Sequence, residues 1–194
     1  SEFDAAREVS QQLWKNQLQL VEVDSEGADE EQLTKFFSSL YRASMAPTTY
    51  TETVGTTKQY RGFDGGVHEW AFGTDSDYFS DMSIWDIHRT QLPWFVLTDP
   101  NRAQNIARSL VQIADDGGRI PRWPLANVYT GCMIADHGYS FIADSCVKGI
   151  QGVNFTKALG YMREIGLGGG TGGQRTGYGN YSTIGYVTEA ENEE

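Results

Sequence analysis

The spacing of apolar residues predicts two helices at the start of the chain. Residues 3–22 keep apolar side chains at near-helical spacing, with charged and amide side chains between them: Phe3, Ala6, Val9 and Leu13. After a short break at residues 25–27, a second amphipathic stretch carries the apolar face Leu33, Phe36, Phe37, Leu40 and Tyr41. Pro47 stops this helix by about Ala46. Two consecutive helices with a short connection are expected to lie antiparallel.

The helical period disappears over residues 48–82, which we expect to form a loop and hairpin insertion. Residues 49–54 and 57–61 are compatible with a β-hairpin around Gly55. The Gly- and Asp-rich segment that follows carries carboxylates that suggest calcium: Asp64, Asp75, Asp77 and Asp81. Their spacing does not fit an EF-hand loop. Aspartates that simply form turns are the alternative.

A strongly apolar pattern over residues 83–98 predicts another helix, but it contains Asp86, His88 and Arg89. Asp86 and Arg89 are three residues apart and would share a helix face. Charges inside an apolar run must be paired or must serve a ligand. Two interpretations therefore remain open, an internal ion pair and a polar cluster that binds sugar hydroxyls.

Three further helices are predicted in the second half of the chain. The sequence Thr98-Asp99-Pro100 supplies a capping side chain and a first-turn proline, and Gly117-Gly118 closes the helix that follows. Residues 131–148 read as a long helix that carries His137, and residues 153–165 as another. A lone helical histidine is more often a satisfied core residue than a ligand.

Residues 166–194 read as a Gly-rich loop with an acidic tail. Seven glycines fall between Gly168 and Gly179, without the Lys-Ser/Thr of a phosphate loop and without a preceding strand. This pattern argues against nucleotide binding and favours a surface loop.

The order of elements predicts an all-α fold in which residues 1–194 form a single segment. Helical hairpins that follow one another, with long loops at one end and a small β-hairpin, are typical of an α/α toroid. A closed barrel of six hairpins needs about twice the roughly six long helices predicted here. We therefore expect part of an (α/α)6 barrel, with a smaller irregular bundle as the alternative.

Charge excludes two classes of partner. The chain has 194 residues, a net charge of −11 and a pI near 4.7, which argues against nucleic acid and against an anionic membrane. A solvated acidic surface and cation binding both remain compatible with it. No run of about 18 apolar residues occurs. No signal peptide is visible at residue 1, so we expect a mature, truncated or engineered start.

Two cysteines and two sequons bear on the compartment. Cys132 and Cys146 would lie about 21 Å apart on one helix, so they should not pair, and we expect two buried thiols. Asn154 and Asn180 begin Asn-X-Ser/Thr triplets and are candidate glycosylation sites. The sequons favour a secreted or extracellular protein.

Several motifs resemble the catalytic domain of glycoside hydrolase family 92. They are YRGFDG at residues 60–65, SIWDIHR at residues 83–89, WPL from Trp123, TGCMI at residues 130–134, and His137. The resemblance implies a calcium-dependent, inverting exo-α-mannosidase, in which a β-sandwich precedes an (α/α)6 barrel. It implies that this chain is the first half of that barrel, and that a companion polypeptide completes it.

The same resemblance places a tyrosine at the position of the catalytic acid. Inverting glycosidases use two carboxyl groups about 6.5–9.5 Å apart. The family's acid is a Glu two positions before the glycine of the Thr-Gly-Cys-Met motif, where this chain has Tyr129. A phenol has a pKa near 10, against about 4.3 for Glu, so it is a poor general acid. The family's base and most of its calcium ligands would lie beyond Glu194.

The resemblance further implies a mannose pocket near Trp85, Asp86 and Arg89, with Asp64 and His137 nearby. A mannose-type glycan or another small ligand would be the partner. Two functions follow: part of an α-mannosidase with impaired hydrolysis, or a non-catalytic binding, pigment or storage/assembly subunit derived from the family. An independent helical interaction domain is a third alternative, which would expose the faces that normally meet the missing helices.

Overall fold

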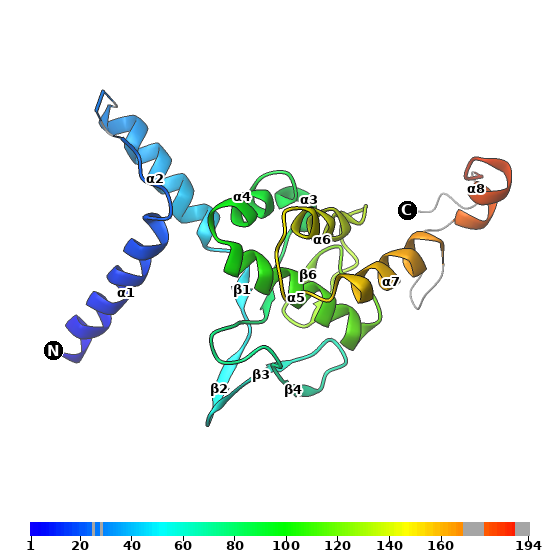
Figure 1. Cartoon of the computed structure of the whole chain (residues 1–194), viewed down its shortest axis with the longest axis horizontal. Helices are drawn as coiled ribbons and strands as arrows, with labels where there is room; N and C mark the ends of the chain where they lie inside the picture. The colour runs from blue at the N-terminus through cyan, green and yellow to red at the C-terminus, as the bar shows by residue number, and fades with distance from the viewer. Residues whose placement is uncertain (25, 28, 169–176, 189–194) are drawn as a thin grey trace.

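The computed structural model describes residues 1–24, 26–27, 29–168 and 177–188 and is mainly helical (Figure 1). The helices, with the strands between them, follow in the order α1 (Glu2–Leu18), α2 (Glu30–Ser44), β1 (Thr48–Thr49), β2 (Glu52–Val54), β3 (Thr57–Arg61), β4 (Val67–Glu69), β5 (Phe79–Ser80), α3 (Ile84–Ile87), α4 (Gln91–Thr98), α5 (Pro100–Gly117), β6 (Pro124–Leu125), β7 (Val128–Tyr129), α6 (His137–Val147), α7 (Phe155–Gly166) and α8 (Tyr178–Ile184).

Helices α1 and α2 begin at side-chain caps and extend away from the body of the molecule (Figure 1). Ser1 and Asp4 form a capping box, and the Asp29 side chain accepts a hydrogen bond from the backbone N–H of Gln32. In Figure 1 the axes of the two helices lie at a wide angle, and their C-terminal halves are in contact, with the rings of Trp14 and Tyr41 4.4 Å apart. The predicted antiparallel pair is therefore not formed along their length. Because α1 ends at Leu18 rather than at residue 22, the connection is longer than predicted.

The predicted β-hairpin is present and gains a third strand. Strand β2 pairs with β3 in antiparallel register, with Glu52 opposite Gln59, and β3 pairs with β4, with Tyr60 opposite His68. Gly55 has φ 62° in the turn between β2 and β3, a backbone conformation that side chains with a Cβ rarely adopt. There are two smaller strand pairs. Strands β1 and β5 pair although they are distant in sequence, whereas β6 and β7 are adjacent in sequence.

Helix α5 forms the centre of the core. Its start and end are as predicted. At the start, the Asp99 side chain accepts a hydrogen bond from the backbone N–H of Arg102, and at the end Gly118 adopts a left-handed conformation with φ 91°. Helices α4, α6 and α7 and strand β5 pack against it. Its apolar stripe is fully buried: Ala103, Ile106, Ala107, Leu110, Ile113 and Ala114. Each buried Ile or Leu side chain contributes about 1.5–3 kcal/mol relative to exposure.

The single helix predicted over residues 83–98 is wrong, because two helices occupy this segment. Pro93 lies in the first turn of α4 and cannot donate a hydrogen bond to a preceding turn. A continuous helix therefore cannot pass through it, and the chain breaks around Thr90, with φ −126° and ψ −82°. Asp86 and Arg89 are consequently exposed rather than enclosed in an apolar run.

The helix predicted to begin at residue 131 begins only at His137. Gly131, Met133 and Ala135 all have positive φ, at 68°, 64° and 67°, which a right-handed helix excludes. The change of structure also corrects the prediction of buried thiols, since Cys132 and Cys146 are both exposed. Both are free, as expected from their separation.

The C-terminal region is described in part. Helix α7 begins at the Asn154 cap, whose side chain accepts from the Lys157 backbone N–H at 3.0 Å. Within the range predicted as loop, Tyr178–Ile184 forms the short helix α8. The remainder of the Gly-rich loop and acidic tail, residues 169–176 and 189–194, lies outside the described residues. Among the described helices, none combines the length and the apolar character needed to cross a membrane.

We expect Leu110→Ala to lower the free energy of unfolding by about 2–5 kcal/mol, because it opens a cavity between α5 and the elements packed against it. Leu110 is 0% exposed, whereas Leu97 on α4 is 71% exposed. Leu97→Ala is therefore the matched control, with a change of less than about 0.5 kcal/mol. Urea unfolding curves measure both, and equal effects would contradict the central role of α5.

Candidate functional site

The turn before Tyr129 is anchored to the rest of the fold by a carboxylate. Asp81 accepts hydrogen bonds from the Tyr50 hydroxyl at 2.9 Å and from the Ala126 backbone N–H at 2.7 Å. Ala126 itself adopts a left-handed backbone conformation, with φ 49°, between β6 and β7. These contacts fix the position at which β7 presents Tyr129.

Tyr129 is a bracing residue at the C-terminal end of α5. Its hydroxyl donates to the Arg119 carbonyl at 2.6 Å and accepts from the Arg119 backbone N–H at 3.3 Å. The ring packs edge-on against Phe63 at 4.8 Å, and the Arg119 guanidinium lies 4.2 Å from its centroid. Gly117 makes room for the phenol, because a Cβ there would lie 2.5 Å from the hydroxyl oxygen.

Burial raises the pKa of the Tyr129 phenol to about 12, although contacts with Arg119 oppose the shift. The phenol therefore keeps its proton at neutral pH, and that proton is already engaged with the Arg119 carbonyl. A group in this state cannot protonate a leaving oxygen efficiently.

The structure brings Trp85, Arg89 and His137 together around His88. The His88 Nδ1 atom lies 2.9 Å from the Trp85 carbonyl oxygen, and Arg89 Nε donates to His88 Nε2 at 3.1 Å. The imidazoles of His88 and His137 are stacked, with centroids 3.6 Å apart and planes at 8°. The Trp85 side chain is 45% exposed beside this group.

The internal ion pair between Asp86 and Arg89 does not form. Asp86 instead accepts a hydrogen bond from the Ser83 hydroxyl, and Arg89 donates to His88. The sequence pattern indicated His88 as a polar residue within an apolar segment, but it did not predict that His88 connects the other residues of this group. The position of His88 within the motif at residues 83–89 was the signal that could have identified it.

His137 occupies the first position of α6 in a partly buried site. Burial lowers the pKa of its imidazole, and the neighbouring His88 and Arg89 lower it further, while Asp136 opposes this. The ring is therefore neutral at neutral pH, which suits its stacking on His88.

Asp64 lies in a second group of residues, on the turn between β3 and β4. His68 Nε2 is 2.9 Å from both Asp64 carboxylate oxygens, and the Gly66 backbone N–H donates to Asp64 Oδ1 at 2.8 Å. These hydrogen bonds lower the pKa of Asp64 and raise that of His68. Within the described ranges, no hydrogen bond, ion pair or ring contact joins Asp64 to the cluster around His88.

Asp116 lies beneath this turn and was missed in the sequence. Its carboxylate accepts from Gln112 at 2.8 Å and from the Tyr60 hydroxyl at 3.4 Å. A Cβ on Gly62 would lie 2.7 Å from Asp116 Oδ2, so the turn packs closely on this carboxylate. Burial raises the pKa of Asp116. Its position in the polar last turn of α5 gave no signal for this role.

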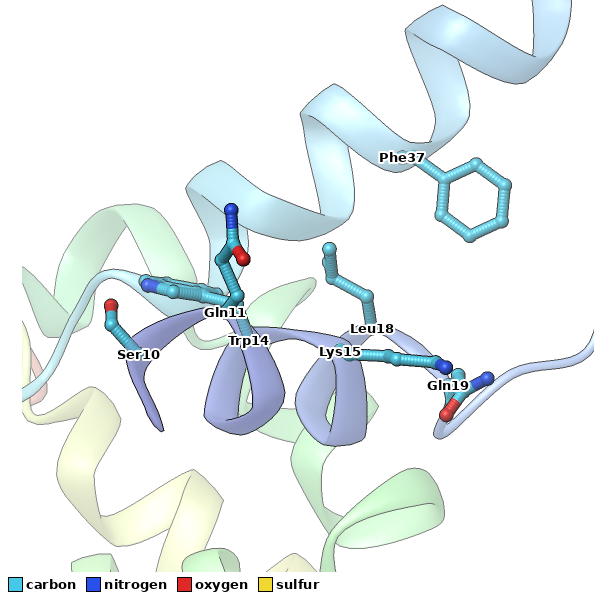
Figure 2. A pocket seen from close by; sticks show the side chains of 7 residues that line it. All are labelled: Ser10, Gln11, Trp14, Lys15, Leu18, Gln19 and Phe37. Carbon is cyan, nitrogen blue, oxygen red and sulfur yellow. The ribbon is translucent and has the colours of Figure 1, made fainter. Parts of the chain in front are cut away.

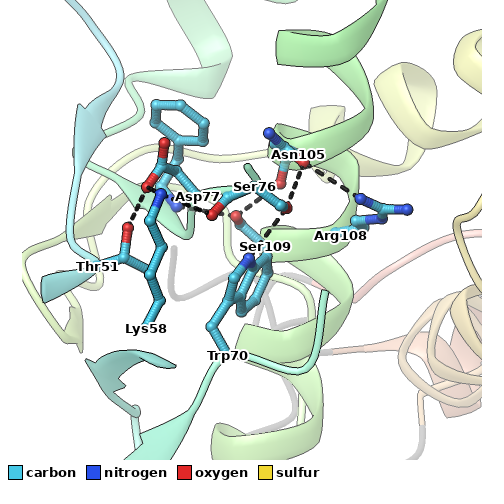
Figure 3. A network of polar contacts seen from close by, with 9 residues as sticks. Thr51, Lys58, Trp70, Ser76, Asp77, Asn105, Arg108 and Ser109 are labelled. Atoms are coloured by element: carbon cyan, nitrogen blue, oxygen red, sulfur yellow. Dashed lines mark hydrogen bonds and ion pairs between the residues drawn. The ribbon is translucent and has the colours of Figure 1, made fainter. Parts of the chain in front are cut away.

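A polar network ties the Asp-rich segment to α5 (Figure 3). Lys58 Nζ donates to Asp77 at 2.7 Å, and Ser76 accepts from the Trp70 indole at 3.0 Å while donating to Asn105 at 2.7 Å. Asp77 and Asp81 are thus both engaged with protein groups. Over the part of the chain that the structure describes, no three His, Cys, Asp or Glu side chains are grouped to hold a metal.

The two candidate glycosylation sites differ in setting. Asn154 is exposed at the start of α7, where its carbonyl oxygen caps the helix and its amide nitrogen is not needed for the cap. Asn180 is partly buried within α8.

We expect Tyr129→Phe to lower the free energy of unfolding by about 1–3 kcal/mol, because the Arg119 carbonyl loses its donor in a partly buried place. Tyr181, which is 56% exposed, provides the control, and Tyr181→Phe should change stability by less than about 0.5 kcal/mol. Thermal or urea unfolding measures both. An unchanged Tyr129→Phe protein would contradict the bracing role.

The Asp64–His68 pair should be visible in the titration of His68. Asp64 contributes to stability above the pKa of an unfolded aspartate, and this contribution is lost as the pH falls through the lowered pKa of the folded state. His68 contributes to stability below about pH 6.5, and this contribution is lost as the pH rises through the raised pKa of the folded state. The pair is therefore strongest between about pH 4 and pH 6.5.

In an NMR titration we expect the His68 midpoint to lie above 6.5, the ordinary value for histidine. Asp64→Asn should lower that midpoint, because it removes the negative charge that favours the imidazolium. Asp75 is exposed in the same Asp-rich region, and Asp75→Asn should leave the midpoint unchanged. A midpoint that ignores Asp64→Asn would contradict the pairing.

Comparison with known proteins identifies the family. The chain matches the glycosyl hydrolase family 92 catalytic domain over residues 1–194. It is similar to the solved family 92 inverting mannosidase BT2199 from Bacteroides thetaiotaomicron, with 28% identity and a TM-score of 0.79 over 93% of this chain and 24% of that one. The α-mannosidase BT3965 from the same organism gives 26% identity and a TM-score of 0.81 over 95% of this chain and 24% of that one.

A structure of BT3965 in complex with mannoimidazole gives a TM-score of 0.82 at 26% identity, over 95% of this chain and 23% of that one. The chain thus spans about a quarter of the length of these structures. Curated protein sequences gave no match. The predicted resemblance and the predicted partial α/α toroid are confirmed, and the chain belongs to glycosyl hydrolase family 92.

Proposed function

We propose that this chain forms the first part of the catalytic domain of an α-mannosidase, supplies sugar-binding side chains to it, and needs further polypeptide for hydrolysis. The observation that carries the proposal is the family match over residues 1–194, with mannosidases as structural neighbours. Membership of the family supports a glycoside hydrolase-like function for the domain as a whole.

The group around His88 provides the chemistry for holding a sugar ring. The exposed Trp85 ring offers an apolar face for stacking. Asp86 on α3 offers hydrogen-bond acceptors, and Arg89, which directly follows the C-cap residue of α3, offers donors. A mannose-type glycan is the ligand that we propose, because BT3965 binds mannoimidazole. Asp64, held by His68, would contribute a further carboxylate from the second group.

Hydrolysis would be impaired by the residue at the acid position. Tyr129 is neutral and its proton is engaged, so it does not replace a carboxylic acid tuned near neutrality. Asp136 is a poor substitute, because it is buried in an ion pair with Arg122 at 3.2 Å. A general acid would therefore have to be a residue other than these two.

Calcium does not fit the side chains described here. The family is a calcium-dependent one, yet no group of suitable ligands occurs in residues 1–24, 26–27, 29–168 or 177–188. Calcium would then be held by residues outside these ranges. No step of the proposed function of these residues passes through the metal.

A companion polypeptide would cover the apolar surface of α1 and α2. Residues of α1 such as Phe3 and Leu13 are 72% and 65% exposed, and α1 has no buried residue. Figure 2 shows the side chains that line the groove between the two helices, among them Trp14, Leu18 and Phe37. The groove has a volume of about 430 Å³. Such a surface favours completion of the domain over an independent interaction module.

The alternative is a family-derived binding, pigment or storage/assembly subunit without catalysis. It is favoured by the tyrosine at residue 129, the position that the resemblance assigns to the catalytic acid. Under either function we expect a secreted or extracellular protein that is glycosylated at Asn154 or Asn180.

The test is hydrolysis and binding of α-mannosides by the protein together with its companion chain. We expect slow turnover of an aryl α-mannoside, because an activated leaving group needs little acid assistance, and loss of that turnover with a chelator. Turnover of an unactivated disaccharide should be slower by at least about 100-fold. Trp85→Ala should weaken binding about tenfold, and Leu97→Ala should leave it unchanged.

Binding without any turnover of the aryl mannoside would support the non-catalytic alternative. Absence of both binding and turnover would contradict the proposed function.

A further inference from the structure

The guanidinium group of Arg89 is held at one point. Its Nε atom donates to His88 Nε2 at 3.1 Å, and the side chain is otherwise exposed. Across the described residues, no other hydrogen bond or ion pair involves this guanidinium. The two terminal amino groups are therefore free to donate to a ligand with two acceptor oxygens, such as adjacent hydroxyls of a sugar.

Both hydrogen bonds of His88 require the same neutral tautomer. An Nε2 atom that accepts from Arg89 carries no proton, so the ring proton is on Nδ1. Nδ1 lies 2.9 Å from the Trp85 carbonyl oxygen, which can only accept. The imidazole thus connects the backbone of Trp85 to the side chain of Arg89 through two hydrogen bonds that one tautomer can form at the same time.

The stack with His137 fixes the plane of the His88 ring. The parallel arrangement, at 3.6 Å and 8°, leaves the imidazole edge in line with Arg89 Nε and with the Trp85 carbonyl. His137 is the first residue of α6, and a cation at a helix N-terminus is unfavourable. Helix α6 therefore supports the neutral pair.

The charged and titratable groups around His88 come from several parts of the chain. Arg89 donates to its Nε2 atom, the imidazole of His137 stacks on its ring, and Asp136 directly precedes His137. Asp86 on α3 is bonded to Ser83. Asp144 of α6 and Lys148, the C-cap residue of α6, line the same cavity as His88 and form an ion pair at 2.8 Å.

We propose that His88 is a positioning residue: as the neutral Nδ1–H tautomer it holds Arg89 for recognition of adjacent sugar hydroxyls, and its protonation releases Arg89. A protonated His88 can no longer accept from Arg89, and the two cations repel each other. Sugar affinity therefore falls on acidification through the titration of one imidazole. The choice of a sugar as the ligand rests on the proposed function, whereas the positioning of Arg89 by His88 does not.

Two substitutions separate the acceptor of His88 from its donor. Gln in His88→Gln can place a carbonyl oxygen near the position of Nε2, so it keeps the acceptor for Arg89 and does not titrate. Asn in His88→Asn can place an amide N–H near the position of Nδ1, so it keeps the donor to Trp85 and loses the acceptor. A role in packing alone would not distinguish the two variants in this way.

Binding of methyl α-mannoside is measured from pH 5 to pH 8 with the protein and its companion chain. For the unsubstituted protein we expect affinity to fall about tenfold as His88 gains a proton, as for the loss of one hydrogen bond to a charged group. His88→Gln should stay within about threefold of the affinity at pH 8 and lose the acid dependence. His88→Asn should bind about tenfold more weakly at every pH. Where the protein turns over an aryl mannoside, KM should carry these effects and kcat should not.

His137→Phe is the control for the second imidazole. It retains an aromatic face against His88 but removes the titration of residue 137. The chain contains three histidines, so His68 is the remaining one. We expect His137→Phe to keep the acid dependence, and its loss in this variant would overturn the assignment to His88.

NMR provides a readout that does not depend on sugar binding. Long-range ¹H–¹⁵N spectra should show His88 as the Nδ1–H tautomer at pH 8, and the Arg89 Nε–H signal should be protected from exchange. That protection should disappear on acidification and in His88→Asn, but persist in His88→Gln. If both variants fail to fold, the tautomer of the unsubstituted protein decides.

The outcomes separate the two proposals. The expected NMR result without sugar binding would overturn the proposed function and retain the positioning of Arg89. An Nε2–H tautomer, or identical behaviour of His88→Gln and His88→Asn, would overturn the role of His88.

Discussion

Burial of one face of α5 is the constraint on which the rest of the structure depends. Helices α4, α6 and α7 and strand β5 all pack against it, and its apolar stripe is inaccessible to solvent. The end of α5 also sets the position of the Arg119 backbone, to which Tyr129 is bonded. Asp116 in its last turn supports the turn that carries Asp64. One helix therefore fixes both the core and the framework under the second group of polar residues.

The sequence predicted those parts of the fold whose causes are local. Asp99 and Gly118 mark the two ends of α5, and Gly55 marks the hairpin turn, because each residue has a conformational or capping role that does not depend on the tertiary structure. The loop before His137 could not be predicted in this way. Met133 and Ala135 are ordinary helix-compatible residues, and only the tertiary structure holds them at positive φ.

For the candidate site, too, the sequence predicted residues but not their arrangement. Motif residues such as Trp85 and Arg89 could be selected from the sequence, and the structure places them with His137 around His88. Their geometry could not be selected, because it depends on a ring stack between α6 and the end of α3. Asp64 lies in the other group for the same reason. The register of β3 and β4 places Tyr60 opposite His68, and His68 then contacts Asp64 on the connecting turn; motif spacing contains no information on that register.

The fit between Gly117 and Tyr129 restricts which side chain residue 129 can carry. The phenol occupies space that a Cβ on residue 117 would need, packs against Phe63 and bonds to the Arg119 backbone. A single substitution of Tyr129 by Glu would lose the ring contacts and would bring a carboxylate close to the Arg119 carbonyl. A carboxylic acid at residue 129 would thus require compensating changes around it. The packing around Gly117 and the bonds to the Arg119 backbone make the identity of residue 129 a matter of stability as well as of chemistry.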